Sequence, residues 1–138
     1  MNSLALALAR LAQLQAETVD RMALHEAAMA ATDQEPHTQL ATVCRHLHIK
    51  PARWLKVAEA SAVPALLHRE ESSWGILRGL NGQGQWIAEW FDSETQKWME
   101  QALDPATLAL CSIARVRLMK PYEASKSPVL KLVKDELL

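Results

Sequence analysis

The sequence has 138 residues, of which 49% are hydrophobic and 22% are charged, and its formal net charge is -1. This length suits one ordinary domain that buries a core without disulfides or metals. A near-neutral chain with scattered Lys and Arg has no basic field for phosphates, so nucleic acid is not an expected partner. No stretch approaches the ~20 apolar residues of a membrane span, so we expect a soluble domain.

The first part of the sequence predicts three helices. Asn2 or Ser3 can cap the first, in which Leu4, Leu8, Leu11 and Leu14 recur at steps of three and four residues. The second is expected from about Thr18 to the polar cluster at 32–36, and the third from about Thr38. Cys44 falls on the apolar face of the third helix.

After Pro51 the pattern changes to short segments rich in β-branched, aromatic and aliphatic residues. Turn-forming residues at 81–84 and 92–95 separate some of them, and Asp104 followed by Pro105 favours a short helix. The predicted strands are 53–57, 63–69, 74–78, 85–91, 96–100 and 111–118. Helices followed by an antiparallel sheet predict the α+β class.

Two cysteines, Cys44 and Cys111, lie far apart in the sequence. Two thiols in a domain of this size are more often free and buried than bridged, and we expect both to be unbridged and shielded. The spacing of Cys44, His46 and His48 resembles a metal-ligand string. Residues two apart on a helix point to opposite sides, so we predict no metal site here.

Tryptophan makes up five of the seven aromatic residues, and four of the five lie in the predicted hairpins: Trp74, Trp86, Trp90 and Trp98. On a strand, Trp86 and Trp90 share one face while Ile87 and Phe91 share the other, so both faces are apolar. One face can pack on the helices. The other must be covered, or it is available to a partner.

This order of elements, with Leu-Leu-His-Arg at 66–69, Ser-Trp-Gly-Ile-Leu-Arg at 73–78 and Trp-Ile-Ala-Glu-Trp at 86–90, resembles the bacteriocin-processing cysteine peptidase family. That family is a papain-like domain at the N-terminus of ABC exporters, and its active members cleave double-glycine leader peptides. The resemblance implies a peptidase-like domain over residues 1–118, with helices packed on an antiparallel sheet. Residues 119–138 would be a linker, with a short amphipathic helix at 129–138, leading to a transmembrane domain outside this sequence.

In active members a Cys opens the first helix, a His begins a strand, and an Asp followed by Pro ends the next strand. On this sequence those positions fall at about Ser3, at Ser73 and at Glu89. A serine hydroxyl without a nearby base is a very poor nucleophile. The resemblance therefore implies a degenerate peptidase domain that is not an enzyme.

The sequence is similar to the inactive domains of type I secretion ATPases, which export large repeat toxins and adhesins. The resemblance implies a domain at the cytoplasmic face of the bacterial inner membrane that binds the unfolded substrate. We expect some of Trp74, Trp86, Trp90 and Trp98 to contact that substrate. No cofactor is expected in this domain, while ATP and magnesium belong to a nucleotide-binding domain of the same polypeptide outside this sequence.

Two other hypotheses remain open. The chain is an active leader peptidase if its nucleophile lies elsewhere, for which Cys44 is the candidate and loss of activity in Cys44→Ala the sign. Alternatively it is an unrelated α+β protein-interaction domain, because similarity at the level of the fold does not fix function.

Overall fold

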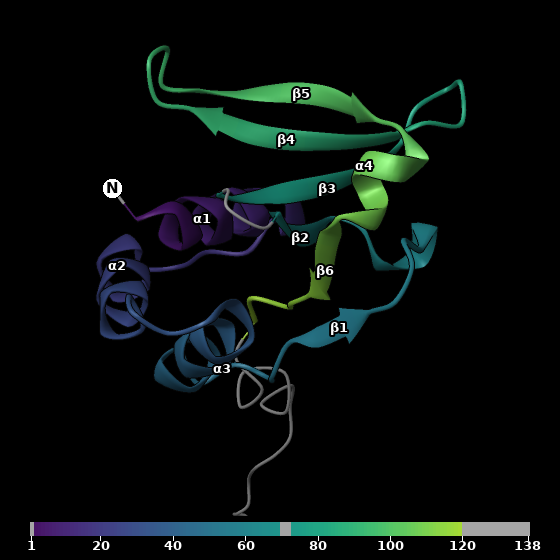
Figure 1. Cartoon of the computed structure of the whole chain (residues 1–138). Helices are drawn as coiled ribbons and strands as arrows, with labels where there is room; N and C mark the ends of the chain where they lie inside the picture. Colours follow the sequence, from purple (N-terminus) through teal and green to yellow (C-terminus); the bar gives the residue numbers. More distant parts are fainter. Residues whose placement is uncertain (1, 70–72, 120–138) are drawn as a thin grey trace, which may run out of the picture.

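A computed structural model describes residues 2–69 and 73–119, so the predicted linker from Lys120 onward and the helix at 129–138 lie outside the described residues. The chain begins with α1 (Ser3–Gln15), α2 (Arg21–Ala30) and α3 (Pro36–His46) (Figure 1). The side chain of Asn2 caps α1 by accepting hydrogen bonds from the backbone N–H groups of Leu4 and Ala5. The prediction of three successive helices is confirmed.

The second and third helices do not begin at the predicted residues. α2 begins at Arg21 and not at Thr18, because the Asp20 carboxylate caps it by accepting the backbone N–H of Met22. α3 begins at Pro36 and not at Thr38. A proline suits the first helical position, where its missing N–H costs nothing.

Within the described residues, one antiparallel sheet of six strands follows the helices, in the order β1-β6-β2-β3-β4-β5. This confirms the α+β class. The strands are β1 (Arg53–Leu55), β2 (Ala65–Arg69), β3 (Trp74–Leu80), β4 (Trp86–Asp92), β5 (Lys97–Leu103) and β6 (Cys111–Arg115). The short helix α4 (Pro105–Ala109) joins β5 to β6, and a 3₁₀ turn (Ala60–Ala62) lies between β1 and β2.

Pairing between strands sets their lengths. β5 was predicted to end at Glu100 but continues to Leu103, since it pairs residue by residue with β4 from Asp92↔Lys97 to Trp86↔Leu103. Conversely, β6 ends at Arg115, where its pairing with β1 ends, and not at Leu118.

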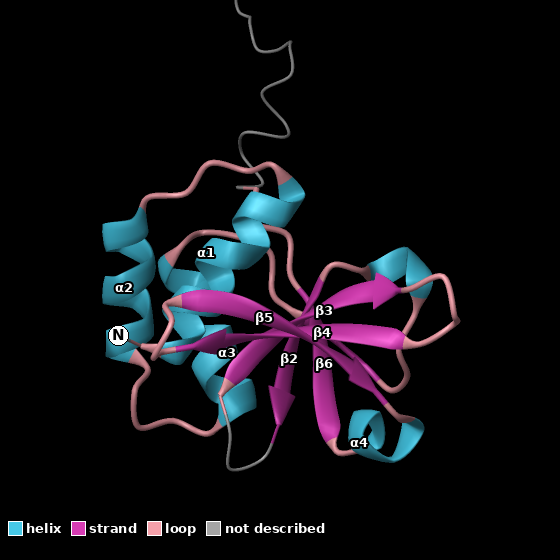
Figure 2. Cartoon of the chain, turned by 90° about the horizontal axis from the view of Figure 1, so that it is seen from above, coloured by secondary structure: helices cyan, strands magenta, loops and turns pink. Residues whose placement is uncertain are grey.

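The sheet has two faces with different cover. Figure 2 shows α1, α2 and α3 gathered on one side of the twisted strands and α4 on the other. We call these the helix face and the far face. The helix face carries the larger core, which includes Leu8, Leu40, Leu66 and Ile76, and the far face a smaller one, of which the buried members are Ala65, Leu67, Leu77, Ala88, Leu103 and Ile113. Among the helices in the described ranges, none is long and apolar enough to cross a membrane.

Candidate functional site

The first turn of α1 lies against the start of β3. Ser3 Oγ accepts a hydrogen bond from the backbone N–H of Trp74 at 2.8 Å, which joins residues 71 positions apart in the sequence. Two of the positions that the family resemblance singled out, Ser3 and Ser73, are therefore brought together. The side chains at both positions are hydroxyls, and a hydroxyl needs a base to become a nucleophile.

The third of these positions, Glu89, lies elsewhere. It is on β4 opposite Ile76, and only 2% of its surface is exposed. Its carboxylate accepts from Arg10 Nε at 2.7 Å and Nη2 at 3.1 Å, and from Arg78 Nη1 at 2.5 Å. Arg10 follows Ser3 by seven residues on α1, which is about 10 Å along a helix axis. Glu89 therefore belongs to an ion-pair cluster under α1 and not to the two serines.

Ion pairing favours the charged form of the groups in this cluster. Burial raises the pKa of Glu89, but the hydrogen bonds from Arg10 and Arg78 outweigh that effect and hold the pKa below the ordinary value of 4.5. The hydrogen bond to Glu89 is also the main reason why the pKa of Arg10 is raised. Sequence reasoning missed both arginines. The available signal was Glu89 itself. It is a charged residue between Ile87 and Phe91 on a strand that is apolar on both faces, so it needs a charged partner.

The four tryptophans predicted to contact a substrate do not form one surface. Trp74 is 5% exposed, so it is a core residue, and its Nε1 donates to Gln39 Oε1 at 3.3 Å. Its ring lies 4.7 Å from the ring of His68 and 6.3 Å from that of Trp54, between centroids. Trp74 therefore stabilises the contact of α3 with the sheet and offers little surface to a ligand.

Trp86 and Trp90 lie together on the far face, as the strand pattern predicts. The Trp90 indole covers Gly75, where an added Cβ would come within 2.5 Å of Trp90 Cε3. Trp90 Nε1 donates to Gln101 Oε1 at 2.8 Å, and the Arg69 guanidinium lies 5.2 Å from the ring centroid. These contacts hold the ring against the sheet.

Trp98 lies on the helix face, beside a groove. The groove runs between α1 and the β4–β5 hairpin and has a volume of about 480 Å³. We call it the α1–hairpin groove. Its lining residues are Leu6, Ala9, Arg10, Gln13, Arg21, Phe91, Ser93, Gln96 and Trp98. Phe91 and Trp98 meet edge to face with ring centroids 5.5 Å apart, and they form the wall on the sheet side.

The strand that carries Trp98 is also an edge of the sheet. Among the described strands, β5 and β1 are the two edges, with seven and three residues respectively. Trp98 pairs with Phe91 on the helix face, and Met99 pairs with Trp90 on the far face. An edge strand presents backbone N–H and C=O groups to which another chain can pair. β5 therefore offers a longer template than β1.

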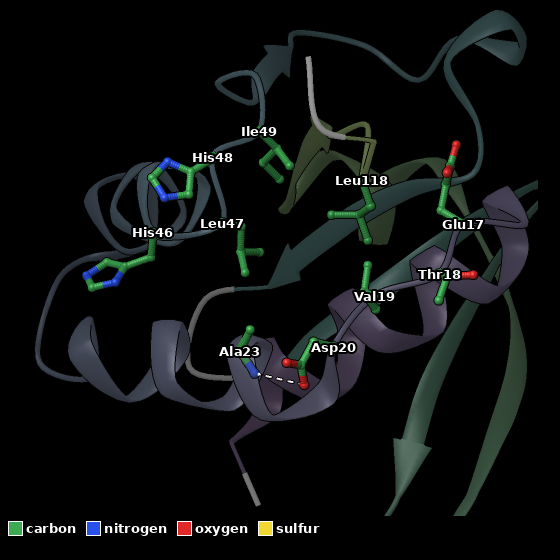
Figure 3. A pocket seen from close by; sticks show the side chains of 10 residues that line it. All are labelled: Glu17, Thr18, Val19, Asp20, Ala23, His46, Leu47, His48, Ile49 and Leu118. Carbon is green, nitrogen blue, oxygen red and sulfur yellow. Dashed lines mark hydrogen bonds between the residues drawn. The ribbon is translucent and has the colours of Figure 1, made fainter. Parts of the chain in front are cut away.

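A second cavity lies beyond the C-terminal end of α1 (Figure 3). It is lined by Glu17 and Asp20 from the α1–α2 connection, by His46 and His48 from the end of α3, and by Leu118 among others. The two histidines lie on the opposite side of this cavity from Glu17. In residues 2–69 and 73–119, no three His, Cys, Asp or Glu side chains group as metal ligands would.

Cys44 is removed from both cavities. It is 1% exposed in the core, and burial raises the pKa of its thiol although a backbone hydrogen bond with Ala52 opposes this. Cys111 is partly buried on the far face. Both thiols are unbridged, as predicted, but the expected shielding holds in full only for Cys44.

Comparison of the chain with protein-family models, with curated proteins and with solved structures finds no match.

Proposed function

We propose that this chain is a non-catalytic, papain-like docking domain of a type I secretion ABC transporter. In this proposal it holds an unfolded segment of an exported toxin or adhesin at the cytoplasmic face of the bacterial inner membrane. The membrane and ATPase domains, with ATP and magnesium, would belong to the rest of the same polypeptide.

One observation carries the docking role: β5 is a seven-residue edge strand next to a groove walled by Phe91 and Trp98. An extended chain that adds to a sheet edge gains main-chain hydrogen bonds, and pockets beside the edge select its alternate side chains. An unfolded export substrate supplies such a chain, whereas a folded protein hides its backbone. The α1–hairpin groove would accept the side chains that point to the helix face.

The non-catalytic part of the proposal is supported by the residues at the positions that the resemblance assigns. Ser3 lies next to Ser73, but the two side chains provide only hydroxyl groups. The carboxylate of Glu89 is paired with Arg10 and Arg78. The alternative nucleophile, Cys44, is buried, and its pKa is raised and not lowered. A reactive thiol needs a lowered pKa and access to solvent.

The docking role is tested with a labelled probe that exists both folded and unfolded. Calcium-bound α-lactalbumin is the folded form, and the same protein reduced and carboxymethylated is the unfolded form. We expect the unfolded probe to bind with a dissociation constant on the order of micromolar or weaker, as suits a transporter that must release its cargo. Equal binding of the folded form would contradict the proposal.

The place of binding is tested by amide chemical-shift perturbation on the isotope-labelled 138-residue chain. We expect the largest shifts at 97–103 in β5, and little change at 53–55 in β1, the matched control edge. Shifts confined to β1 or to the cavity of Figure 3 would place the binding elsewhere.

The absence of peptidase activity is tested with double-glycine leader substrates and mass spectrometry. We expect no cleavage by the wild-type chain. Cleavage that is lost in Cys44→Ala would establish the peptidase alternative instead.

A further inference from the structure

The α1–hairpin groove combines apolar and cationic side chains. Leu6, Ala9, Phe91 and Trp98 supply the apolar surface, while Arg10 and Arg21 stand on the sides formed by α1 and α2. None of the residues that line this groove is an Asp or a Glu. The cavity of Figure 3 differs, because both Glu17 and Asp20 line it.

Arg10 is held in place from beneath. Its Nε and Nη2 donate to Glu89, and its Nη1 donates to Gln13 Oε1 at 3.1 Å, which is a second groove residue. A guanidinium carries five N–H donors, and these contacts use three of them. Arg10 is therefore a pre-oriented donor at the groove wall, with capacity for an oxygen acceptor on a ligand.

The two charged side chains that line the groove, Arg10 and Arg21, are both positive. Arg10 and Arg78 are balanced by Glu89, which contacts both, and by Glu100, whose charge also acts on Arg10. Arg21 adds a positive charge that this cluster does not balance. It is the first residue of α2, and a helix N-terminus is already the positive end of the helix dipole. The neighbouring carboxylate of Asp20 faces the other cavity and caps the helix.

We infer that the α1–hairpin groove selects extended segments in which an apolar side chain stands next to a carboxylate. The apolar side chain fills the space against Phe91 and Trp98, and the carboxylate lies by Arg21 with Arg10 as a positioned donor. This inference rests on the proposed docking function and names the chemistry of the docked segment. Arg21 is the residue that determines the specificity.

The test uses three short peptides of equal length. Each contains valine and phenylalanine in alternation, and the three differ at one variable residue. The variable residue is aspartate, asparagine or lysine. Binding to the 138-residue chain is measured by fluorescence anisotropy. An exposed ion pair contributes up to about 1 kcal/mol, so we expect the aspartate peptide to bind about fivefold more tightly than the asparagine peptide. We expect the lysine peptide to bind most weakly.

Arg21→Gln should abolish most of this preference, because it should weaken binding of the aspartate peptide more than binding of the asparagine peptide. Arg53→Gln, on the opposite edge of the sheet, is the matched control and should keep the preference. Raising the salt concentration from about 0.05 to 0.5 M should also reduce the preference, because exposed charges are screened.

The outcomes separate this inference from the proposed function. If no peptide binds and no β5 amide shifts, both fail. If all three peptides bind alike at β5, docking stands and the charge selection is wrong. If Arg21→Gln and Arg53→Gln lose the preference equally, it comes from the overall field and not from the groove. Concentration-dependent dimerisation that blocks peptide binding would show that a second copy of the chain occupies the groove.

Discussion

The two faces of the sheet are built from similar side chains but differ in what covers them. On the helix face, three helices close over a core that contains Leu4, Leu8 and Leu11 of α1, and Arg10 pairs there with the buried carboxylate of Glu89. On the far face, six buried residues lie under less cover, which includes Leu108 of α4 together with Ala58 and Val63 from the segment between β1 and β2. The neighbours Leu66 and Leu67 on β2 belong one to each face, and both are fully buried.

This difference shows that the elements packed over the sheet, and not the strand pattern, decide whether a tryptophan is a core residue or lines a groove. Trp74 lies where the helices cover the sheet and is a core residue. Trp98 lies where α1 no longer covers the sheet, and it becomes a groove wall. Trp90 lies on the far face, where its ring packs against Gly75 of the neighbouring strand.

The largest expected effect is a loss of stability in Leu66→Ala, with Leu67→Ala as its matched partner. Removing a buried leucine costs about 2–5 kcal/mol, and more where the cavity cannot collapse. The thicker helix face relaxes less, so we expect about 4 kcal/mol for Leu66→Ala and about 2–3 kcal/mol for Leu67→Ala. Urea unfolding followed by circular dichroism measures both. A larger loss for Leu67→Ala would mean that the far face is the more rigid core.

The second effect is that of Glu89→Gln, which leaves two arginines without their carboxylate. Breaking a buried ion pair costs about 3–5 kcal/mol, and we expect about 3 because Arg10 and Arg78 both reach solvent. Glu100→Gln is the control, since Glu100 is exposed and stands opposite Glu89 on β5. The same urea titration should change by less than about 0.5 kcal/mol for the control.

The cost of Glu89→Gln should also depend on pH. Glu89 has a lowered pKa in the folded chain, so its stabilising effect is complete above the ordinary value of 4.5. That effect is lost as the pH falls through the lower folded pKa, where the carboxylate takes up a proton. The difference between wild type and Glu89→Gln should therefore be constant from neutral pH to about 5 and shrink below it. A difference that grows on acidification would contradict the assigned charge state.

Local chemistry made much of the fold predictable. The leucine spacing of α1, the cap at Asn2 and the turn at 81–84 follow from propensities that act over a few residues. The extension of β5 through Glu100 and Gln101 does not follow from local propensity, because cross-strand pairing with β4 overrides the weak strand preference of these residues. The same limit applies to the last strand, because the apolar residues Val116 and Leu118 continue beyond its end at Arg115.

The candidate site was predictable only in part. The alternation along β4 correctly separated Trp86 and Trp90 from Phe91. The groove depends on how α1 and α2 sit against the hairpin, and the contact of Arg10 with Glu89 spans 79 residues. No local pattern encodes such a contact, so Arg21 and Arg10 were not expected at the site.

A third, smaller effect concerns the far face. Gly75→Ala places a Cβ within 2.5 Å of the Trp90 ring and 2.7 Å of the Glu89 carbonyl oxygen, so the ring must move. Overpacking of this kind costs about 1–3 kcal/mol. Gly82→Ala is the control, because nothing lies within 4 Å of its added Cβ. The Trp90 indole N–H resonance, which reports the hydrogen bond to Gln101, should shift in Gly75→Ala only. An unchanged resonance would place Trp90 away from Gly75.

The smallest expected effect is a difference in the rate of chemical modification between two thiols, one from each face of the sheet. It involves no loss of stability. Cys44 lies in the helix-face core and Cys111 in the thinner far-face core, where it is partly buried. Burial raises the pKa of both thiols, and for Cys111 the charge of Arg69 opposes the shift. A buried thiol reacts only when the structure opens, so we expect iodoacetamide to modify Cys111 about tenfold or more faster than Cys44 at neutral pH. Cys44→Ser and Cys111→Ser assign the two rates, and equal rates in concentrated urea show that the folded structure causes the difference. Faster modification of Cys44 would mean an activated thiol in the helix-face core, and the peptidase hypothesis would then be preferred to docking.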